Sequence, residues 1–322
     1  MKQWTAGILA AALAAAGTAW AQAYPTKPVR IMVGYAPGGG VDTTARIMAQ
    51  ALGELWGGNV LVENRPGAAG NIATEATAKA APDGYTLVLC NIGSHAITPA
   101  RFAKRLTYDP VGDFAFPIKI GGIPNVFMVH PSMPARTLQQ YIDYARRNPG
   151  KLHFGSSGVG ASPHLSIELW KSISKIDIVH VPYKGAALAL ADAMSGHIES
   201  SVGNLAGGPL GAIKAKRVRA LAVTSATRNA QVPDVPTFAE SGVPGYDVTG
   251  WYGLCTQSKV PQPILDKLAA DGNKLLAGPL KKRLEEQGIA VEPSTPEKFR
   301  EHVKSEIAKW TKVVAEAKLE GN

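Results

Sequence analysis

The sequence predicts an α/β protein with two lobes, and three observations support this. From Val29 onwards, short apolar runs rich in β-branched residues alternate with longer amphipathic segments. Gly, Pro, Asn or Ser residues stand at each junction between them. The alternation ends and begins again after Pro131, so it forms two series. Such alternation is typical of parallel strands joined by crossover helices.

The first 23 residues precede this pattern and are typical of a signal peptide. Lys2 is followed by the apolar, Ala-rich stretch 6–16 and then by Ala19-Trp20-Ala21-Gln22-Ala23. The apolar run is shorter than the ~20 residues that span a bilayer. A buried N-terminal helix is the alternative, but it would not require the small-x-small ending. We expect cleavage after Ala23, or else after Ala21. Cleavage after Ala23 leaves 322 − 23 = 299 residues, free in an extracytoplasmic space.

Composition and charge exclude several classes of function. The net charge of +9 becomes +8 without Lys2, and the basic residues are scattered, the densest cluster lying in 214–219. We therefore expect no nucleic-acid partner, and a mildly basic surface that attracts anionic solutes. Neither H-E-x-x-H, nor a Cys/His spacing suited to zinc, nor a phosphate-binding loop is present, so no metal and no cofactor are expected.

The first series of elements lies in residues 29–91. Each predicted element has either the period of a half-buried helix or the β-rich composition of a buried strand. The predicted strands are 29–35, 60–63 and 85–91, and the predicted helices are 42–56 and 71–80.

The second series follows a helix whose face carries Leu138, Tyr141, Ile142 and Ala145 and which ends before Asn148-Pro149-Gly150. The predicted strands are 152–154, 176–181, 198–202 and 218–223, and the predicted helices are 163–172, 186–194 and 209–215.

Pro- and Gly-rich segments bracket the second series and are the candidate hinges. They are Gly121-Gly122-Ile123-Pro124 before it and Val232-Pro233-Asp234-Val235-Pro236 after it. We therefore predict three parts of the chain: a signal peptide at 1–23, a discontinuous α/β lobe 1 at 24–122 and 237–322, and an α/β lobe 2 at 123–236.

A final helix is predicted after Thr295-Pro296-Glu297, because Thr caps a helix start well and Pro favours the first turn. Its apolar residues follow helical spacing and are expected in the core. They are Phe299, Val303, Ile307, Trp310 and Val314.

The loop after the first strand is the strongest candidate for ligand contact. It reads Tyr35-Ala36-Pro37-Gly38-Gly39-Gly40-Val41-Asp42 and opens the first helix. Glycines let the backbone approach a ligand, and a helix start offers unpaired N–H groups to an anion. Asp42 either contacts the ligand or caps the helix itself. The consecutive glycines lack the G-x-G-x-x-G spacing of a dinucleotide site.

A matching loop follows the first strand of the second series, at Phe154-Gly155-Ser156-Ser157-Gly158-Val159-Gly160-Ala161-Ser162-Pro163-His164. Its serines and the amides around Gly160 are potential donors to a carboxylate, with Ser162 as the expected helix cap. The alternative is a hydrolase with Ser157 as nucleophile and His164 as base. The order Gly-Ser-Ser-Gly does not match the G-x-S-x-G nucleophile elbow, and no acid is placed to orient the histidine.

Ligands of open α/β sheets gather at the carboxyl ends of strands, which adds three candidate segments. These are Asn91-Ile92-Gly93-Ser94-His95, Val181-Pro182-Tyr183-Lys184-Gly185 and Val202-Gly203-Asn204. Cys90 and Cys255 each end an apolar, strand-like run. An oxidising compartment permits a disulfide, but two buried free thiols are the alternative, and geometry decides between them.

Seven motifs occur in order along the whole mature chain. They are Tyr24-Pro25-Thr26-Lys27-Pro28, Pro37-Gly38-Gly39-Gly40-Val41-Asp42, Val62-Glu63-Asn64-Arg65-Pro66-Gly67-Ala68-Ala69-Gly70-Asn71, Pro82-Asp83-Gly84-Tyr85-Thr86, Phe154-Gly155-Ser156-Ser157-Gly158, Val181-Pro182-Tyr183-Lys184-Gly185 and Gly250-Trp251-Tyr252-Gly253. With these motifs the chain resembles the solute-binding receptors of tripartite tricarboxylate transporters, also called Bug proteins.

The resemblance implies a periplasmic-binding-protein-like (type II) fold with two crossovers between the lobes, and a periplasmic, monomeric receptor without catalytic residues. Family members bind small carboxylates such as organic acids, acidic amino acids or aromatic acids. They deliver them to membrane permease subunits, or alternatively report to a membrane sensor. The ligand-binding residues transferred by motif are Gly39, Gly40, Val41, Asp42, Ser94, Ser156, Ser157, Gly160, Tyr183 and Asn204.

Two positions depart from the family pattern. Val41 stands where a hydroxyl residue is common, and Gly203-Asn204 replaces Asp-Asn. Both changes imply a less polar site, so the resemblance does not identify the carboxylate.

Overall fold

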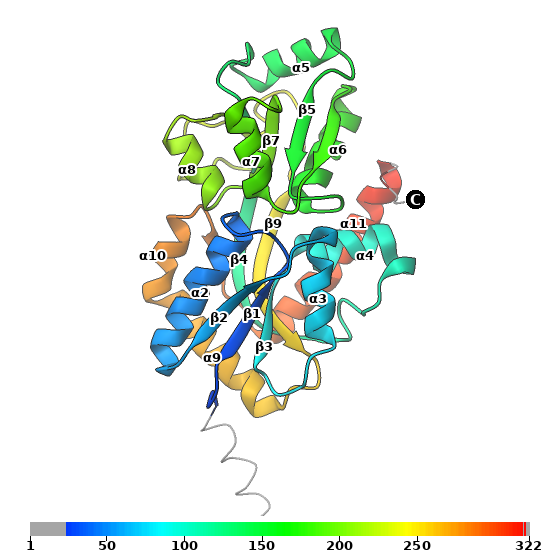
Figure 1. Ribbon diagram of the computed structural model, residues 1–322. Coiled ribbons are helices and arrows are strands. Elements are labelled where there is room, and N and C mark those ends of the chain that lie inside the picture. Colours follow the sequence, from blue (N-terminus) through cyan, green and yellow to red (C-terminus); the bar gives the residue numbers. More distant parts are fainter. Residues whose placement is uncertain (1–23, 318, 320–322) are drawn as a thin grey trace, which may run out of the picture.

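Three parallel strands open the fold in the computed structural model, which describes residues 24–317 and 319 (Figure 1). The predicted signal peptide at 1–23 lies outside the described residues. Strand β1 (Val29–Val33) lies between β2 (Val60–Asn64) and β3 (Thr86–Asn91) and pairs with both in parallel. The connecting segments contain α2 (Gly40–Trp56), the short turn η1 (Ala68–Gly70) and α3 (Asn71–Ala78).

The first sheet is completed by two strands from distant parts of the chain. After η2 (Gly93–Ile97), α4 (Thr98–Phe102) and η3 (Ala103–Arg105), the 16-residue strand β4 (Phe114–Val129) begins. Strand β9 (Thr249–Gln257) lies between β3 and β4 and is antiparallel to both. The order is β2-β1-β3-β9-β4, with the short β10 (Ala290–Val291) also pairing with β4. The parallel pattern inferred from the sequence therefore holds only for β1, β2 and β3 in this sheet.

The second sheet contains the strands of the second series. Parallel strands β5 (His153–Ser156), β6 (Val179–Pro182) and β7 (Ser200–Asn204) join the end of β4, which pairs antiparallel with β7 and β8 (Arg219–Val223). Figure 1 shows this group of elements at one end of the molecule. Its helices are α5 (Leu138–Arg147), α6 (Ser162–Ser174), α7 (Ala186–Ser195) and α8 (Gly208–Lys214).

Strand β4 belongs to both sheets and is the first connection between them. Its residues up to Pro124 pair with β9, and those from Asn125 pair with β7. The second connection enters β9, where Thr249 pairs with Pro124. The first candidate hinge, 121–124, therefore lies at a connection.

The second candidate hinge, 232–236, does not lie at a connection. Val232 is buried in an apolar cluster with residues of α7, α8 and β8, and Phe238 stacks on Tyr246 and contacts the edge of Trp170 in α6. These contacts tie 237–248 to the second sheet. We propose that the second lobe runs from 123 to about 248, with the boundary at Thr249 instead of 237.

The C-terminal helices pack against the first sheet. Helices α9 (Gln262–Ala277) and α11 (Pro296–Glu316) contact β4, and α10 (Pro279–Glu285) packs on α9. The Thr295 hydroxyl accepts a hydrogen bond from the Lys298 N–H at 3.3 Å, which confirms the predicted cap. Four of the five predicted stripe residues are buried, and Ile307 is partly buried. No helix within 24–317 is long and apolar enough to cross a membrane.

Cys90 and Cys255 form a disulfide, which answers the question that the sequence left open. They lie on the adjacent strands β3 and β9, and their Cα atoms are 5.8 Å apart. The bond joins chain segments separated by 165 positions and lies inside the first sheet.

Candidate functional site

The glycine loop is organised by Asp42, which is buried in the first turn of α2. Its carboxylate accepts hydrogen bonds from the Gly38 N–H (3.0 Å), Arg46 Nε (2.9 Å) and Asn64 Nδ2 (2.8 Å). Burial acts to raise the pKa of this carboxyl, but the three hydrogen bonds outweigh burial and lower it. The charged carboxylate is therefore committed to holding the loop.

The second loop is organised by two stacked histidines. The Ser156 hydroxyl lies 2.6 Å from His180 Nε2, and the Gly160 N–H donates to His164 Nδ1 at 3.2 Å. The two imidazole rings stack with centroids 3.9 Å apart. Ser157 is 7% exposed, and its hydroxyl makes no hydrogen bond with a described residue. Of the predicted donors in this loop, Ser157 is thus the one not engaged inside the lobe.

Both loops end in helix starts that are buried and have no side-chain cap. Helix α2 has Gly39 as its N-cap residue and α6 has Ala161, and neither start has a capping hydrogen bond from a side chain. Ser162 was the expected cap of α6, but it is the first helical residue, and its hydroxyl accepts from Asn125 Nδ2 at 3.0 Å instead. Helix starts normally satisfy their first N–H groups with side chains, water or ligands. The first N–H groups of both helices can therefore bond to an acceptor from outside the helix.

The lobes are in contact at these loops. The Ala36 N–H donates to the Lys184 carbonyl at 2.9 Å, and the Gly208 N–H donates to the Gly38 carbonyl at 3.1 Å. A side chain at position 40 would place its Cβ only 3.1 Å from Asn204 Cβ and 3.2 Å from Ala206 Cβ. The structure therefore places Gly39, Gly40 and Asn204 together, in a closed arrangement of the lobes.

A chain of amide and hydroxyl groups connects the two helix starts. Asn204, at the end of β7, donates from Nδ2 to Asn125 Oδ1 at 2.8 Å, and Asn125 in turn donates to Ser162. Asn125 is fully buried on β4. This residue could not be predicted from local sequence, because only the register of β4 against β7 places it opposite Asn204.

The remaining predicted residues lie at the edge of this region. Ser94 is buried in lobe 1, where its hydroxyl lies 2.9 Å from His95 Nδ1. The Tyr183 hydroxyl donates to Asp192 Oδ2, and its pKa is raised to about 12 by burial and by this carboxylate. Val41 is buried in the apolar cluster of lobe 1.

A cavity of about 260 Å³ opens between the lobes beside these residues. Its volume is close to the lower end of small-molecule pockets, which begin near ~300 Å³. Ser157, Tyr183 and Lys184 line it from lobe 2, and Gly34 and 67–69 line it from lobe 1. Two predicted site residues therefore face a space that both lobes enclose.

Tyr252 is a further residue of this region that the candidate set omitted. It lies on β9 and is 2% exposed, and its hydroxyl is 3.2 Å from the position that a Cβ on residue 40 would take. Within the described residues this hydroxyl has no hydrogen-bond partner. The motif Gly250-Trp251-Tyr252-Gly253 was a signal for this residue, but it did not indicate the direction of the side chain.

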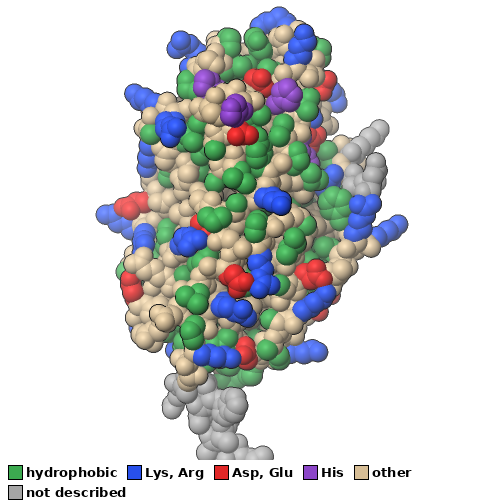
Figure 2. Space-filling model, in the orientation of Figure 1, with side chains coloured by type: hydrophobic (Ala, Val, Ile, Leu, Met, Phe, Trp, Pro, Cys, Tyr) green, Lys and Arg blue, Asp and Glu red, His purple; other side chains and the backbone are tan. Residues whose placement is uncertain are grey.

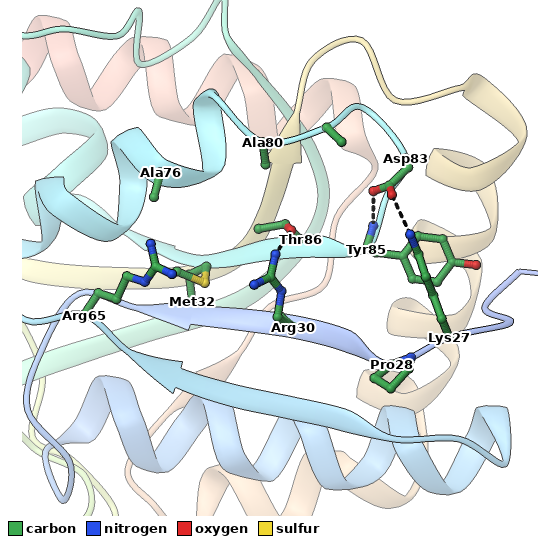
Figure 3. A pocket seen from close by; sticks show the side chains of 11 residues that line it. Lys27, Pro28, Arg30, Met32, Arg65, Ala76, Ala80, Asp83, Tyr85 and Thr86 are labelled. Carbon is green, nitrogen blue, oxygen red and sulfur yellow. Dashed lines mark hydrogen bonds and ion pairs between the residues drawn. The ribbon is translucent and has the colours of Figure 1, made fainter.

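A second cavity, of about 330 Å³, lies on lobe 1 away from the interlobe contact (Figure 3). Its cations already have partners. Lys27 pairs with Asp83 at 2.9 Å and lies over the Tyr85 ring, while Arg30 and Arg65 both approach Glu63. We therefore place the candidate solute site between the lobes.

Two further observations concern metal-ligating groups and surface charge. Within 24–317, no group of three or more His, Cys, Asp or Glu side chains could hold a metal ion. Figure 2 shows Lys and Arg side chains spread over one face and interspersed with acids.

The sequence matches the model of the tripartite tricarboxylate transporter family receptor over residues 44–319. The chain belongs to this family. A UPF0065 protein from the tcbD-tcbE intergenic region of Pseudomonas sp. strain P51 is 35% identical over 93% of this chain and 89% of its own length. BugT of Bordetella pertussis is 31% identical over 96% of this chain and 95% of its own length.

Solved structures of similar proteins agree with the fold. A periplasmic transporter protein has a TM-score of 0.89 and 37% identity, covering 92% of this chain and 99% of its own. An R. palustris protein solved with adipate has a TM-score of 0.87 and 35% identity, covering 91% and 98%. MatC from Rhodopseudomonas palustris, solved with malate, has a TM-score of 0.83 and 29% identity, covering 90% and 100%.

These comparisons establish the class of the protein. Its fold is that of the periplasmic binding proteins, as the resemblance implied. The family consists of solute-binding receptors and not of enzymes, so the hydrolase alternative based on Ser157 and His164 is rejected. The geometry agrees, because His164 Nδ1 is occupied by the Gly160 N–H.

Proposed function

We propose that this receptor captures a small carboxylate between its lobes and delivers it to the permease subunits of a tripartite tricarboxylate transporter. The observation that carries the proposal is the pair of buried, uncapped helix starts of α2 and α6. Their N–H groups and positive dipole ends favour an anion. The related proteins solved with adipate and malate support a carboxylate as that anion.

The proposed contacts are mainly backbone N–H groups at Gly39, Gly40 and Val41 in lobe 1 and hydroxyl and amide groups of lobe 2. Among the residues that the structure describes, none forms a hydrogen bond with the Ser157 hydroxyl, and Asn204 lies against Gly40. Asp42 supports the loop from behind. Ser94, Ser156, Gly160 and Tyr183 are proposed to shape the site, since their polar groups are bonded within their own lobes.

We also propose that the protein acts in the periplasm as a monomer, after removal of residues 1–23. Tyr24, the first residue after the predicted cleavage, is 4% exposed and donates from its hydroxyl to the Gly84 carbonyl. The residue directly after the expected cleavage position is thus packed into lobe 1. Sequencing the N-terminus of the exported protein tests this: Tyr24 supports it, and an intact Met1 contradicts it.

The binding proposal is tested by thermal denaturation of residues 24–322 with adipate, malate, citrate and aromatic acids, and with their uncharged amides as matched controls. A bound ligand at 100 times its Kd stabilises the folded state by about 2.7 kcal/mol. We expect at least one carboxylate to raise the melting temperature and its amide not to. Stabilisation by the amides alone would contradict an anion site.

Delivery to a permease is distinguished from signalling by uptake. We expect cells that lack this protein to lose uptake of the labelled carboxylate and to regain it when the protein is restored. The alternative, a receptor that reports to a membrane sensor, predicts unchanged uptake and a lost transcriptional response.

A further inference from the structure

Tyr252 extends from β9 to the point where the lobes meet. On β9 it lies opposite Asn91 of β3 and Gly121 of β4, in the middle of the first sheet. A Cβ added to residue 40 would lie 3.2 Å from the Tyr252 hydroxyl, which belongs to lobe 1. It would also lie 3.1 Å from Asn204 Cβ and 3.2 Å from Ala206 Cβ, which belong to lobe 2. The hydroxyl therefore belongs to the interlobe region and not to the interior of lobe 1.

This hydroxyl is unusual among the buried tyrosines because it has no partner. The Tyr35 hydroxyl donates to the Ala69 carbonyl at 2.7 Å, that of Tyr108 to the Ser94 carbonyl at 2.8 Å, and that of Tyr246 to the Ser166 carbonyl. The Tyr252 hydroxyl is enclosed and unpaired within the described residues. A buried hydroxyl that loses water without gaining a partner destabilises the fold, and such groups are rare unless they serve a ligand or water.

The protonation state of the Tyr252 hydroxyl allows it to donate a hydrogen bond. Burial, with a smaller contribution from Tyr35, raises the pKa of Tyr252 well above the usual value for tyrosine. The phenol is therefore neutral at physiological pH and keeps its proton. A neutral O–H next to a helix start can donate to an anionic oxygen, and hydrogen bonds to ionised acceptors are stronger than those between neutral groups.

We infer that the Tyr252 hydroxyl donates a hydrogen bond to a carboxylate oxygen of the bound solute, next to the start of α2. This residue would then be a side-chain determinant of affinity at a site otherwise formed mostly by backbone. The inference rests on the proposed carboxylate-binding function and assigns to it a contact that the motif-based set of residues lacks.

The test compares Tyr252→Phe with Tyr246→Phe, using calorimetric titration with the carboxylate that most stabilises the wild type. Each variant removes one buried hydroxyl and keeps the ring. We expect Tyr252→Phe to weaken binding roughly tenfold to hundredfold, as for a hydrogen bond to a charged group. The melting temperature of this variant without ligand should stay the same or rise. Tyr246→Phe should do the opposite, with a lower melting temperature and unchanged affinity.

The outcomes separate the inference from the proposed function. If the wild type binds no carboxylate, the proposed function fails. If the wild type binds and Tyr252→Phe binds equally well, this inference alone is overturned. It is also overturned if Tyr252→Phe without ligand loses as much stability as Tyr246→Phe, because the hydroxyl would then have a partner inside the protein.

Discussion

At the scale of single residues, Asp42 combines a charge with a structural role. It is buried and receives hydrogen bonds from Gly38, Arg46 and Asn64, so the glycine loop is fixed by a side chain of the helix that follows it. The sequence left open whether Asp42 contacts a ligand or caps its own helix. The start of α2 has no side-chain cap from a described residue, so Asp42 holds the preceding loop instead of capping the helix. A charged carboxylate would also repel a carboxylate solute.

We predict that Asp42→Asn lowers the free energy of unfolding by roughly 1–3 kcal/mol at pH 7. The lowered pKa of Asp42 means that its contribution is complete above the ordinary carboxyl pKa of ~3.9 and is lost as the pH falls through the folded-state value. The difference from wild type should therefore shrink near pH 3. Urea unfolding at both pH values measures it.

The matched control is Asp143→Asn, which changes an exposed acid 3.9 Å from Arg146 and should leave stability unchanged. If Asp42→Asn lowers the free energy of unfolding by the same amount at pH 3 as at pH 7, the carboxylate charge is not the source of the stabilisation.

Gly203 has a packing reason that the sequence did not reveal. A Cβ at this position would lie 3.0 Å from Ala186 Cβ in α7 and 3.3 Å from Pro209 Cγ in α8. An acidic side chain, which the resemblance implies for this position, would require these two neighbours to shift by a few tenths of an ångström. Glycine at position 203, in place of an acidic residue, therefore fits the close packing of α7 and α8 on β7, in addition to implying a less polar site.

At the scale of elements, α5 and α11 are the described helices whose starts have a side-chain cap, from the hydroxyls of Thr137 and Thr295. Helices α2 and α6 share the lack of a cap with the other described helices. Their distinction is their place, because Gly40 and Gly160 beside these two starts approach atoms of the other lobe. The first N–H groups of an exposed helix start can bond to water. At a buried start without a side-chain cap, another group must supply the acceptor.

We predict that Gly40→Ala weakens solute binding at least tenfold without lowering the melting temperature of the free protein. The added methyl group favours the helix, but it would contact Asn204 and Ala206 of the opposite lobe when the lobes close. Titration calorimetry and thermal denaturation of the same samples measure the two effects.

Gly211→Ala is the control for Gly40→Ala. Residue 211 is also helical, lies in α8, and has no atom within 4 Å of an added Cβ. It should gain a little stability and keep full affinity. If Gly40→Ala also binds normally, the closed contact around Gly40 is not part of the binding state.

Local patterns were enough to predict the strands and helices of 29–91 and 152–223, because each has its own period and its own turn residues. They did not predict β4, α9 or α10, and of β9 they indicated only the strand-like run that ends at Cys255. Strand β4 contains Pro117, Gly121 and Gly122 and is buried over most of its length, so its sequence lacks an alternating pattern. Its pairing with β9 joins segments more than 120 residues apart and depends on the finished fold.

The same limit applies to the site. Loops 36–42 and 155–164 were recognisable, because glycine, serine and helix-start signals are local. Asn125 and Tyr252 were not placed, since their positions depend on the strand register of β4 against β7 and of β9 against β3.

At the scale of the whole molecule, the buried histidines of lobe 2 connect stability with pH. Burial is the main reason why the pKa of His164 falls to about 2 and that of His180 to about 4. Arg101 and Lys171 lower both values further, and His180 also lowers that of His164. The carboxylate of Glu168 lies 3.9 Å from His164 Nε2. Both imidazoles are therefore neutral in the fold and become protonated more easily when it unfolds.

We predict that stability is full above the ordinary histidine pKa of ~6.5 and falls as the pH decreases towards 4. Each histidine that is neutral in the fold should lower the free energy of unfolding by at most about 2 kcal/mol by pH 5. His180→Gln should reduce the slope of unfolding free energy between pH 7 and 5 by about a quarter, because burial also keeps His95, His164 and His302 neutral in the fold. His197→Gln, at an exposed position, should leave the slope unchanged. Equal slopes for wild type and both variants would contradict this role of the buried pair.

The bond between Cys90 and Cys255 has a topological consequence. Both connections to the second lobe lie between these two residues, so the lobe is part of a closed covalent ring. A protease that cuts once in an exposed loop of this lobe, such as 226–231, opens the ring without releasing a fragment. The nicked receptor should migrate as one species on a denaturing gel and separate into two pieces only when a reductant is added. In a compartment that contains proteases but little reductant, one cut would leave the receptor in a single covalent piece.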